Sequence, residues 1–488
     1  DETYERYYIR SGTRWPHSGV KITGKKPHYL PFPFSLAYAA ACLKNAEFKI
    51  MVIDAVALDM DEQEFLQKVS QFHPDIVFYE MTAPTTRYDL ALAEKIKEVI
   101  NPIVVLGGAQ STFFASEIIQ KYSQIDYVIK GEYELILLQL VQYLKGDDST
   151  LPSGVVYRDS AQVVDTGESE TISNLDVLPS LSRELFPSNW ASNPLLYWDG
   201  FCQLSPAVQL QSSRGCNFNC YFCVCKQVMY RNKPYRAFSL DRVLDEISYL
   251  KKRYRVKEFY FDDDDFLADI NRVVEFSQRL IKEKIDIKWS CMGNLANLEG
   301  EVLKLMVKSG CIGIKFGVES GSLKVLQQLG KLQNLAKLEE ILKICTRYGI
   351  KTQATFCIGL WGEEDGDINE TLNLLKKLDV DSFQISFATP YPGTQVFEKI
   401  DRGRAFEEID WEEFDGKRGR KTFSHFVSHR ALHKFKRNAF YQWFLFHFFN
   451  PLWVYRHRKI ILRVLKGWGF SFLIQQLISV FIDEWKNR

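Results

Sequence analysis

The front of the chain alternates short apolar runs with amphipathic stretches. Helical periodicity covers residues 61–72, 87–100 and 116–123. Between these stretches lie β-branched and aromatic runs, as expected of strands buried in a parallel sheet: KIMVIDAV (49–56), DIVFYEM (75–81), PIVVLGG (102–108) and DYVIKGE (126–132). The pattern predicts a doubly wound, flavodoxin-like α/β domain over residues 1–150. Ligands of such domains bind at the loops that follow the strands.

The same alternation returns in the second half of the chain. Residues 151–205 show no sustained period, so we expect a linker there with one hairpin at 154–167. Six further strands are predicted over residues 206–400: AVQLQSSRG (207–215), EFYFDDDDF (258–266), IKWSCMG (287–293), IGIKFGVES (312–320), KTQATFCIGL (351–360) and SFQISFAT (382–389). With helices between them, they fit a partial (β/α)6 barrel whose chemistry lies at the strand ends.

The composition indicates what class of protein this is and in which cellular compartment we expect it. Apolar residues make up 46% of the chain and charged residues 25%, which is typical of a folded globular protein. The ten cysteines are irregularly spaced and no cleavable leader is recognised, so we expect a reducing cytoplasm. Because the chain begins at Asp1, we expect the first strand of the front sheet to lie upstream of it.

The C-terminal part of the chain differs in charge from the rest. From Gly416 to Ile482 there are thirteen Lys or Arg residues and no Asp or Glu, against 49 basic and 61 acidic residues elsewhere. This asymmetry favours anionic partners. We predict a mainly helical domain over residues 401–488, and two roles remain open for it. It is either a lid over the barrel or an amphipathic element on an anionic membrane surface.

Three cysteines lie close together in SSRGCNFNCYFC. Cys216, Cys220 and Cys223 have the spacing C-x-x-x-C-x-x-C. Three thiolates in a tight loop can hold three irons of a [4Fe–4S] cluster and leave the fourth iron open to a small molecule. A structural zinc site with Cys225 as fourth ligand is an alternative, and so are buried, inert cysteines.

This loop resembles the cluster loop of the radical S-adenosylmethionine (SAM) superfamily. The motifs FYFDDDDF, FGVESGS, CIGLWGE and TPYPGT follow it in the order of that superfamily, and with the front domain the chain resembles its cobalamin-binding branch. The resemblance implies a [4Fe–4S] cluster on Cys216, Cys220 and Cys223 with SAM on the open iron. The SAM-binding residues that it implies are Phe222, Asp263, Asp264, Glu319, Ser320 and Gly359.

For the front domain the resemblance implies a bound cobalamin. The sequence has no D-x-H-x-x-G, the motif that supplies a histidine ligand to cobalt, so we expect cobalamin without a protein histidine on the metal. The cobalamin-binding residues implied by the resemblance follow the predicted strands: Asp54, Thr82, Pro84, Thr85, Gly107, Gly108, Gln110, Ser111, Gly131 and Glu132.

The activity that this resemblance implies is methylation of an unactivated carbon. The cluster would cleave SAM, and methylcobalamin would supply the methyl group. Relatives with the same architecture include oxidative cyclases, and a corrinoid-binding protein without enzymatic activity is a further alternative. We expect a small-molecule, lipid or peptide substrate, an external electron donor such as flavodoxin or ferredoxin, and no nucleic acid. The expected location is cytoplasmic, with contact to the membrane surface through the tail as an option.

Overall fold

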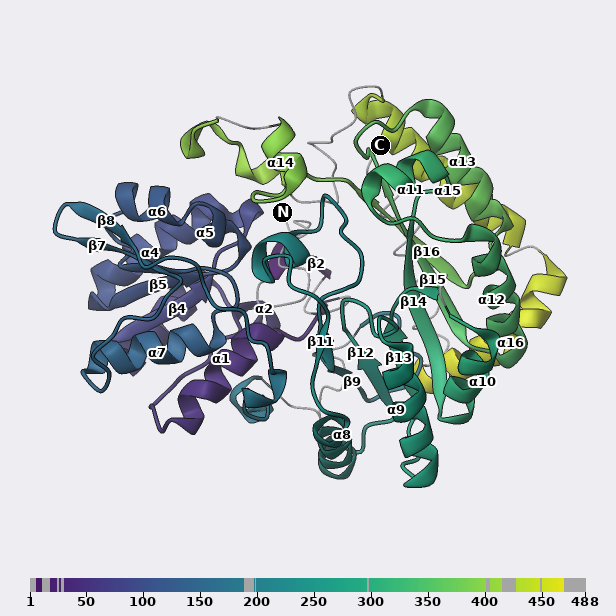
Figure 1. Ribbon diagram of the computed structural model, residues 1–488, viewed down its shortest axis with the longest axis horizontal. Helices are drawn as coiled ribbons and strands as arrows, with labels where there is room; N and C mark the ends of the chain where they lie inside the picture. The colour runs from purple at the N-terminus through teal and green to yellow at the C-terminus, as the bar shows by residue number, and fades with distance from the viewer. Residues whose placement is uncertain are drawn as a thin grey trace. The chain divides into compact units, whose positions relative to one another are not determined.

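The computed structural model describes residues 6–10, 18–23, 26–27, 30–187, 197, 199–295, 298–400, 404–414, 427–447 and 450–468. The chain forms two compact units, each built from three segments (Figure 1). Unit 1 comprises Asp1–Tyr197, Tyr221–Ser239 and Thr389–Lys421. Unit 2 comprises Trp198–Cys220, Leu240–Ala388 and Thr422–Arg488.

Unit 1 contains a five-stranded sheet in the order β4-β5-β6-β7-β8. The strands β4, β5 and β6 are parallel, and β7 and β8 continue the sheet as an antiparallel hairpin. Helices lie on both faces of the sheet, and α1 and α7 pack side by side (Figure 1). The strands are β4 (Ile76–Glu80), β5 (Ile103–Gly107), β6 (Tyr127–Ile129), β7 (Val155–Asp159) and β8 (Gln162–Asp165). The helices are α1 (Phe34–Asn45), α2 (Ala55–Leu58), α3 (Glu62–Phe72), α4 (Thr86–Ile100), α5 (Ala109–Phe113), α6 (Ala115–Lys121), α7 (Glu134–Lys145) and α14 (Gln395–Ile400).

The predicted α/β fold of this unit is confirmed, with two differences. The run 49–56 is not a strand: residues 48–54 lack regular structure, and α2 begins at Ala55. Met51 is 37% exposed and its neighbours are only half-buried, so the run lacks the packing that favours a strand. The hairpin expected within a linker instead pairs with β6 and extends the sheet. A separate antiparallel sheet precedes α1, formed by β1 (Arg6–Arg10), β2 (Ser18–Thr23) and β3 (Lys26–Pro27).

The core of unit 1 draws on segments that are far apart in the sequence. Val104, Val105 and Leu106 of β5 are fully buried, as the apolar run predicts. Residues from the second and third segments join the same hydrophobic cluster, including Val228 and Phe406. The front domain therefore acquires part of its core from residues that follow the cysteine loop.

Unit 2 contains six parallel strands in the order β16-β15-β14-β13-β12-β9, with helices between successive strands. All six predicted strands are present, and the partial barrel is confirmed. The strands are β9 (Ala207–Leu210), β12 (Glu258–Phe261), β13 (Trp289–Met292), β14 (Cys311–Glu319), β15 (Lys351–Ile358) and β16 (Ser382–Phe387). The helices are α8 (Leu240–Tyr254), α9 (Ile270–Lys282), α10 (Gly300–Lys308), α11 (Leu323–Leu329), α12 (Leu335–Tyr348) and α13 (Asp365–Lys377). In α9, Val273, Phe276 and Leu280 are buried at helical spacing, which is why this stretch packs as a helix on the sheet.

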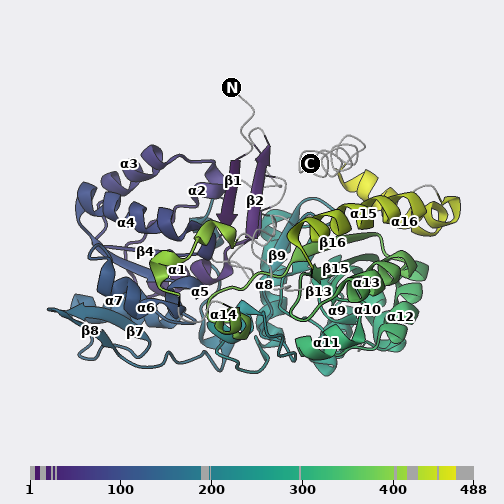
Figure 2. The same cartoon turned by 90° about the horizontal axis from the view of Figure 1, so that it is seen from above.

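The basic tail adds two helices to unit 2, α15 (His429–His447) and α16 (Pro451–Trp468). They run along the outside of this unit, where α15 packs on α13 and α16 on α12 (Figure 2). The rings of His433 and Trp443 in α15 contact Phe387 and Phe383 of the edge strand β16. The predicted helical character of the tail is confirmed for the part that the structure describes.

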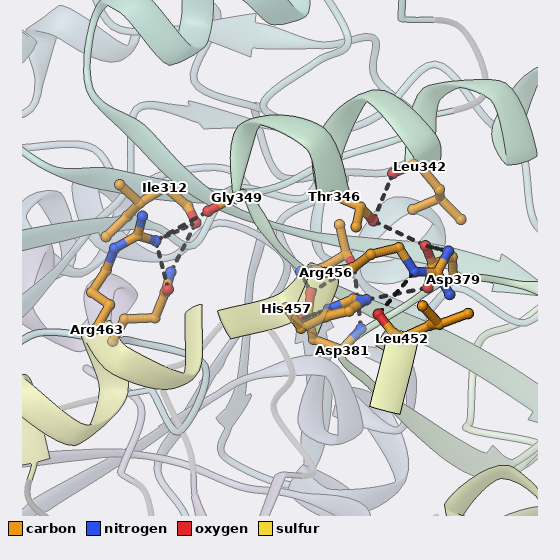
Figure 3. Close-up of polar contacts among 12 residues, drawn as sticks. Ile312, Leu342, Thr346, Gly349, Asp379, Asp381, Leu452, Arg456, His457 and Arg463 are labelled. Carbon is orange, nitrogen blue, oxygen red and sulfur yellow. Dashed lines mark hydrogen bonds and ion pairs between the residues drawn. The ribbon is translucent and has the colours of Figure 1, made fainter. Parts of the chain in front are cut away.

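Helix α16 is anchored where the barrel strands begin (Figure 3). His457 bonds to Asp379 and Asp381, which immediately precede β16. Arg463 donates to the Gln203 side chain at 2.8 Å and to the carbonyl of Gly349, just before β15, at 3.3 Å. Because catalytic loops of such barrels follow the strand ends, α16 lies at the opposite end from them.

Candidate active site

The cysteine loop follows β9 at the carboxyl end of the barrel sheet. Cys216 and Cys220 belong to unit 2, and Cys223 is three residues further along, in the segment that belongs to unit 1. All three side chains are half-buried, and none forms a disulfide. Within the described ranges, no three His, Cys, Asp or Glu side chains converge as ligands of a single metal ion. In a [4Fe–4S] cluster each thiolate binds a different iron, so the chemistry of three cysteine thiols suits such a cluster.

The run of four aspartates braces the start of this loop. Asp263 is fully buried and accepts hydrogen bonds from the backbone N–H and Oγ of Ser212 and from Oγ of Ser213, each at 2.6 Å. Asp264 accepts from the N–H of Gly215 at 2.8 Å. Burial raises the pKa of Asp263 to about 6, and the serine hydrogen bonds oppose this rise. In this structure both carboxylates hold the loop, and their contact with SAM stays a prediction.

The surroundings of Cys216 disfavour its thiolate. Burial and the charge of Asp265 raise the pKa of Cys216 to about 12. The Sγ of Cys216 lies 3.9 Å from Oδ2 of Asp265 and accepts a hydrogen bond from the N–H of Phe218 at 3.5 Å. Since iron binds the thiolate, cluster binding must release this proton.

The end of β14 holds the predicted Glu319 beside a lysine that the sequence reasoning missed. Glu319 has a φ of 67°, in the left-handed region that costs energy for a residue other than glycine. Its Oε1 lies 2.7 Å from Nζ of Lys331, which is only 9% exposed. The available signal was a lysine between apolar residues in the stretch LQQLGKLQN.

Three further residues were predicted to bind SAM. Ser320 and Gly359 form hydrogen bonds within the protein, and Phe222 contacts a neighbouring aromatic ring. Ser320 is fully buried, and its Oγ lies 3.1 Å from Oγ1 of Thr371. Gly359 has a φ of 78°, which glycine tolerates, and its N–H donates to Oε2 of Glu363 at 2.6 Å. Burial raises the pKa of Glu363 to about 7, a perturbed group that the sequence reasoning also missed. Phe222 stands edge-on to the ring of Tyr221 in unit 1.

The loop after β5 in unit 1 offers an open polar group to a ligand. Gly107 and Gly108 end the strand, and Gly108 has a φ of 101°. A Cβ on Gly108 would lie 2.4 Å from Cγ of Glu80, so only glycine fits this turn. The amide oxygen and nitrogen of Gln110 are buried and bond to no other group in the described part of the chain. A buried amide without a partner is costly, and an amide-rich cofactor such as cobalamin fits this requirement.

The remaining residues of the β5 and β4 loops bond among themselves. Ser111 donates to the carbonyl of Gly108 at 3.2 Å. Oγ1 of Thr82 lies 2.8 Å from Oγ1 of Thr85, which donates to Asp89 at 2.6 Å. Pro84 lies between these threonines in a short 3-10 helix, Ala83–Thr85.

The two predicted carboxylates of unit 1 serve internal contacts in this structure. Asp54 caps α2 by accepting from the N–H of Ala57 at 3.0 Å, and it accepts from the Tyr197 hydroxyl at 2.5 Å. Glu132 forms a buried ion pair with Arg236 at 2.7 Å, next to Gly131, whose φ is 70°. Their predicted contact with cobalamin stays a prediction.

Comparison with known proteins agrees with this arrangement. The chain matches the B12 binding domain over residues 20–141 and the Radical SAM superfamily over residues 210–375. It is 31% identical over 417 residues to an uncharacterized methyltransferase of Pyrococcus horikoshii, which covers 85% of this chain and 88% of the relative. It is 26% identical over 413 residues to an anaerobic magnesium-protoporphyrin IX monomethyl ester cyclase of Rubrivivax gelatinosus, covering 82% of this chain and 70% of the cyclase.

A solved structure shares the fold. The radical SAM methyltransferase TsrM of Kitasatospora setae, with cobalamin and a [4Fe–4S] cluster bound, superposes with a TM-score of 0.63 at 17% identity, covering 77% of this chain and 76% of TsrM. The Radical SAM match includes the cysteine loop, and the B12 binding match includes Gln110 with its open amide. The identity to the Pyrococcus protein extends over most of both chains. The chain belongs to the cobalamin-binding branch of the radical SAM superfamily and is an enzyme whose cofactors are a [4Fe–4S] cluster, SAM and cobalamin.

Proposed function

We propose that this enzyme is a C-methyltransferase that methylates an unactivated carbon. The observation that carries the proposal is the 31% identity to a methyltransferase over 88% of that relative's length. The cyclase relative has lower identity and a smaller covered share, and oxidative cyclisation is therefore the second candidate. Both activities require an external reductant, for which we propose a flavodoxin or a ferredoxin.

The protein's own contribution is to hold and orient the reacting groups. When bound, the cofactors supply hydrogen abstraction from the substrate and a transferable methyl group. Cys216, Cys220 and Cys223 would hold the cluster, while Asp263 keeps the preceding turn in place through its three hydrogen bonds. Gln110 would donate and accept hydrogen bonds at the cobalamin.

Product analysis distinguishes the two candidate functions. The full chain is reconstituted anaerobically with iron, sulfide and hydroxocobalamin, reduced, and incubated with SAM that carries a deuterated methyl group. A methyltransferase is expected to form S-adenosylhomocysteine as well as 5′-deoxyadenosine, with the label in the cobalamin fraction. The Gln110→Ala variant, in a chain that keeps its iron, is expected to retain less cobalamin. If 5′-deoxyadenosine forms with cobalamin bound and no S-adenosylhomocysteine appears, the methyltransferase proposal is wrong and the cyclase candidate replaces it.

We further propose that the outer face of α16 binds an anionic membrane surface. The inner face of this helix is buried on the barrel through Trp453, His457 and Ile460, at helical spacing. The outer face presents apolar and basic side chains in one stripe, and three of them are more than half exposed: Leu452 at 71%, Tyr455 at 62% and Leu462 at 54%. The other exposed members of the stripe are Arg458, Lys459 and Lys466.

The positive charge of the outer face of α16 favours an anionic partner. No acidic residue occurs between Gly416 and Ile482, so the stripe is complementary to anionic headgroups. The guanidinium of Arg458 lies 3.8 Å from the centre of the Tyr455 ring, a pairing of cation and aromatic ring suited to the headgroup level of a bilayer. Within the described ranges, no helix has the length and hydropathy needed to cross a bilayer. The proposed contact is therefore peripheral.

Vesicle sedimentation tests this surface. The full chain is expected to bind phosphatidylglycerol vesicles and to bind phosphatidylcholine vesicles less. Leu452→Ser with Leu462→Ser, and separately Arg458→Glu with Lys459→Glu, should abolish this binding without loss of folding, because these side chains are exposed. Tyr249→Ser on α8, which removes a 56% exposed aromatic ring elsewhere in unit 2, is the matched control. Equal binding by the α16 variants, or equal binding to both lipids, would show that α16 is only a cover of the barrel.

A further inference from the structure

We infer that Lys331 is the buried counter-charge of the iron–sulfur loop and that it sets the reduction potential of the cluster. The inference needs the cluster, and it is independent of whether the product is methylated or cyclised. Its basis is a set of contacts within unit 2 that place one cation against the cysteine loop.

The backbone brings Lys331 to this place. Helix α11 ends at Leu329, and Gly330 closes it with a φ of 80°. A Cβ on Gly330 would lie 2.9 Å from the carbonyl oxygen of Asn219, so the helix end packs directly against the residue before Cys220. Glycine is required here by both the left-handed backbone and the close approach.

The side chain of Lys331 is enclosed on several sides. Its Nζ lies 2.7 Å from Oε1 of Glu319 and 5.6 Å from the centre of the Phe218 ring, which is part of the cysteine loop. A Cβ on Gly317 would lie 2.6 Å from this Nζ and 2.2 Å from Oε1 of Glu319. The glycine in FGVE therefore leaves the room that the ion pair occupies.

The charge of Lys331 lies next to the cysteine loop. Burial lowers the pKa of Lys331, but the opposing effect of nearby negative charge, above all that of Glu319, is larger in sum, so the amine stays protonated. The ring of Phe218, which lies between Cys216 and Cys220 in the sequence, is 5.6 Å from Nζ of Lys331. Lys331 is only 9% exposed, and charge interactions are stronger in surroundings that exclude water than at the surface.

Reduction of the cluster makes this interaction larger. An external donor adds one electron to the cluster and no atom leaves or enters, so the negative charge in the loop increases by one. A fixed cation nearby stabilises the reduced form more than the oxidised form and therefore raises the potential, in line with the known effect of local charge on such clusters. Without Lys331, Glu319 would remain as an uncompensated negative charge beside the loop.

The test is an anaerobic redox titration of the reconstituted full chain without SAM, followed by electron paramagnetic resonance. Lys331→Met is expected to lower the ratio of reduced to oxidised cluster at least tenfold at the wild-type midpoint, which is about 59 mV for one electron. Lys331→Arg keeps the positive charge and should have the wild-type midpoint potential. Glu319→Gln should raise the midpoint, and the double variant should return it towards wild type. Lys324→Met is the matched control, since this lysine of α11 is 47% exposed and pairs with Glu364 and Asp367.

The variants separate charge from folding. If Lys331→Met fails to hold iron, the comparison of Glu319→Gln with the double variant still reports the effect of Lys331, because both lack the unpaired buried carboxylate. The inference is supported if the midpoint of the double variant lies at least about 59 mV below that of Glu319→Gln, which corresponds to a tenfold lower ratio of reduced to oxidised cluster. Equal midpoints in that pair would show that Lys331 acts only by neutralising Glu319. A Lys331→Met variant with wild-type iron content and midpoint would show that Lys331 does not set the potential.

Discussion

The anchor of α16 makes the stability of unit 2 depend on pH through His457. His457 is 1% exposed, and its Nε2 lies 3.2 Å from Oδ1 of Asp379 while Nδ1 bonds to Asp381 (Figure 3). The Trp453 ring stacks on it at 4.2 Å between ring centres. Arg456 also reaches Asp379, at 3.0 Å. Two carboxylates thus face one imidazole and one guanidinium in a mostly buried site.

The pKa of His457 gives the magnitude. Burial alone would lower it, but the two aspartates raise it from 6.5 to about 9. A rise of this size corresponds to about 3 kcal/mol of stability for the protonated form. Because the folded pKa lies above the unfolded one, this contribution is complete below pH 6.5 and is lost as the pH rises through 9.

The perturbation that tests this reasoning is His457→Gln. Equilibrium urea unfolding of the full chain at pH 6 and pH 9.5 should show the variant less stable by about 3 kcal/mol at pH 6, and by less than about 1 kcal/mol from this charge at pH 9.5. His73→Gln, which changes an exposed histidine of unit 1, should show no pH-dependent difference. A stability gap for His457→Gln that is the same at both pH values would refute the role of the imidazolium.

Three further substitutions have defined outcomes. Arg236→Met leaves Glu132 as an uncompensated buried charge and should lower the unfolding free energy by about 3–5 kcal/mol in urea titrations; an unchanged midpoint would contradict the buried ion pair. Gly108→Ala forces a Cβ against Glu80 and a strained φ, and should cost about 1–3 kcal/mol and lower cobalamin retention on a desalting column, whereas Gly146→Ala, with open space around it, should retain cobalamin. Asp263→Asn replaces an acceptor of three hydrogen bonds and should cost about 1–3 kcal/mol and reduce iron content after reconstitution; full iron content would show that the loop needs no such brace.

The fold was largely predictable because its strands are local apolar runs. The six barrel strands and β4, β5 and β6 are present where β-branched residues form short blocks. The run 49–56 has the same appearance and is not a strand, because a strand also needs a partner and burial that the run itself does not encode. The pairing of the hairpin β7–β8 with β6 was missed for the same reason.

The candidate site was predictable in its motifs and less so in its contacts. The spacing of Cys216, Cys220 and Cys223 pointed to the cluster, and the glycines of GGAQST to a close backbone approach. The structure shows that Asp263 braces the cysteine loop and that Gln110 keeps a buried amide open. No sequence motif marks Lys331, because the role that we infer for it depends on tertiary packing.

By itself, the sequence determined the positions of most strands and helices and the charge of the tail, because periodicity and composition are local properties of a chain. Its cysteine spacing predicts the ligand set of the cluster. Only the tertiary structure decided which charges meet. Lys331 reaches Glu319 across twelve residues, and His457 reaches Asp379 across 78. Such pairs depend on the folding of helices onto strands, and their strength depends on the exclusion of water, so neither can be read from neighbouring letters.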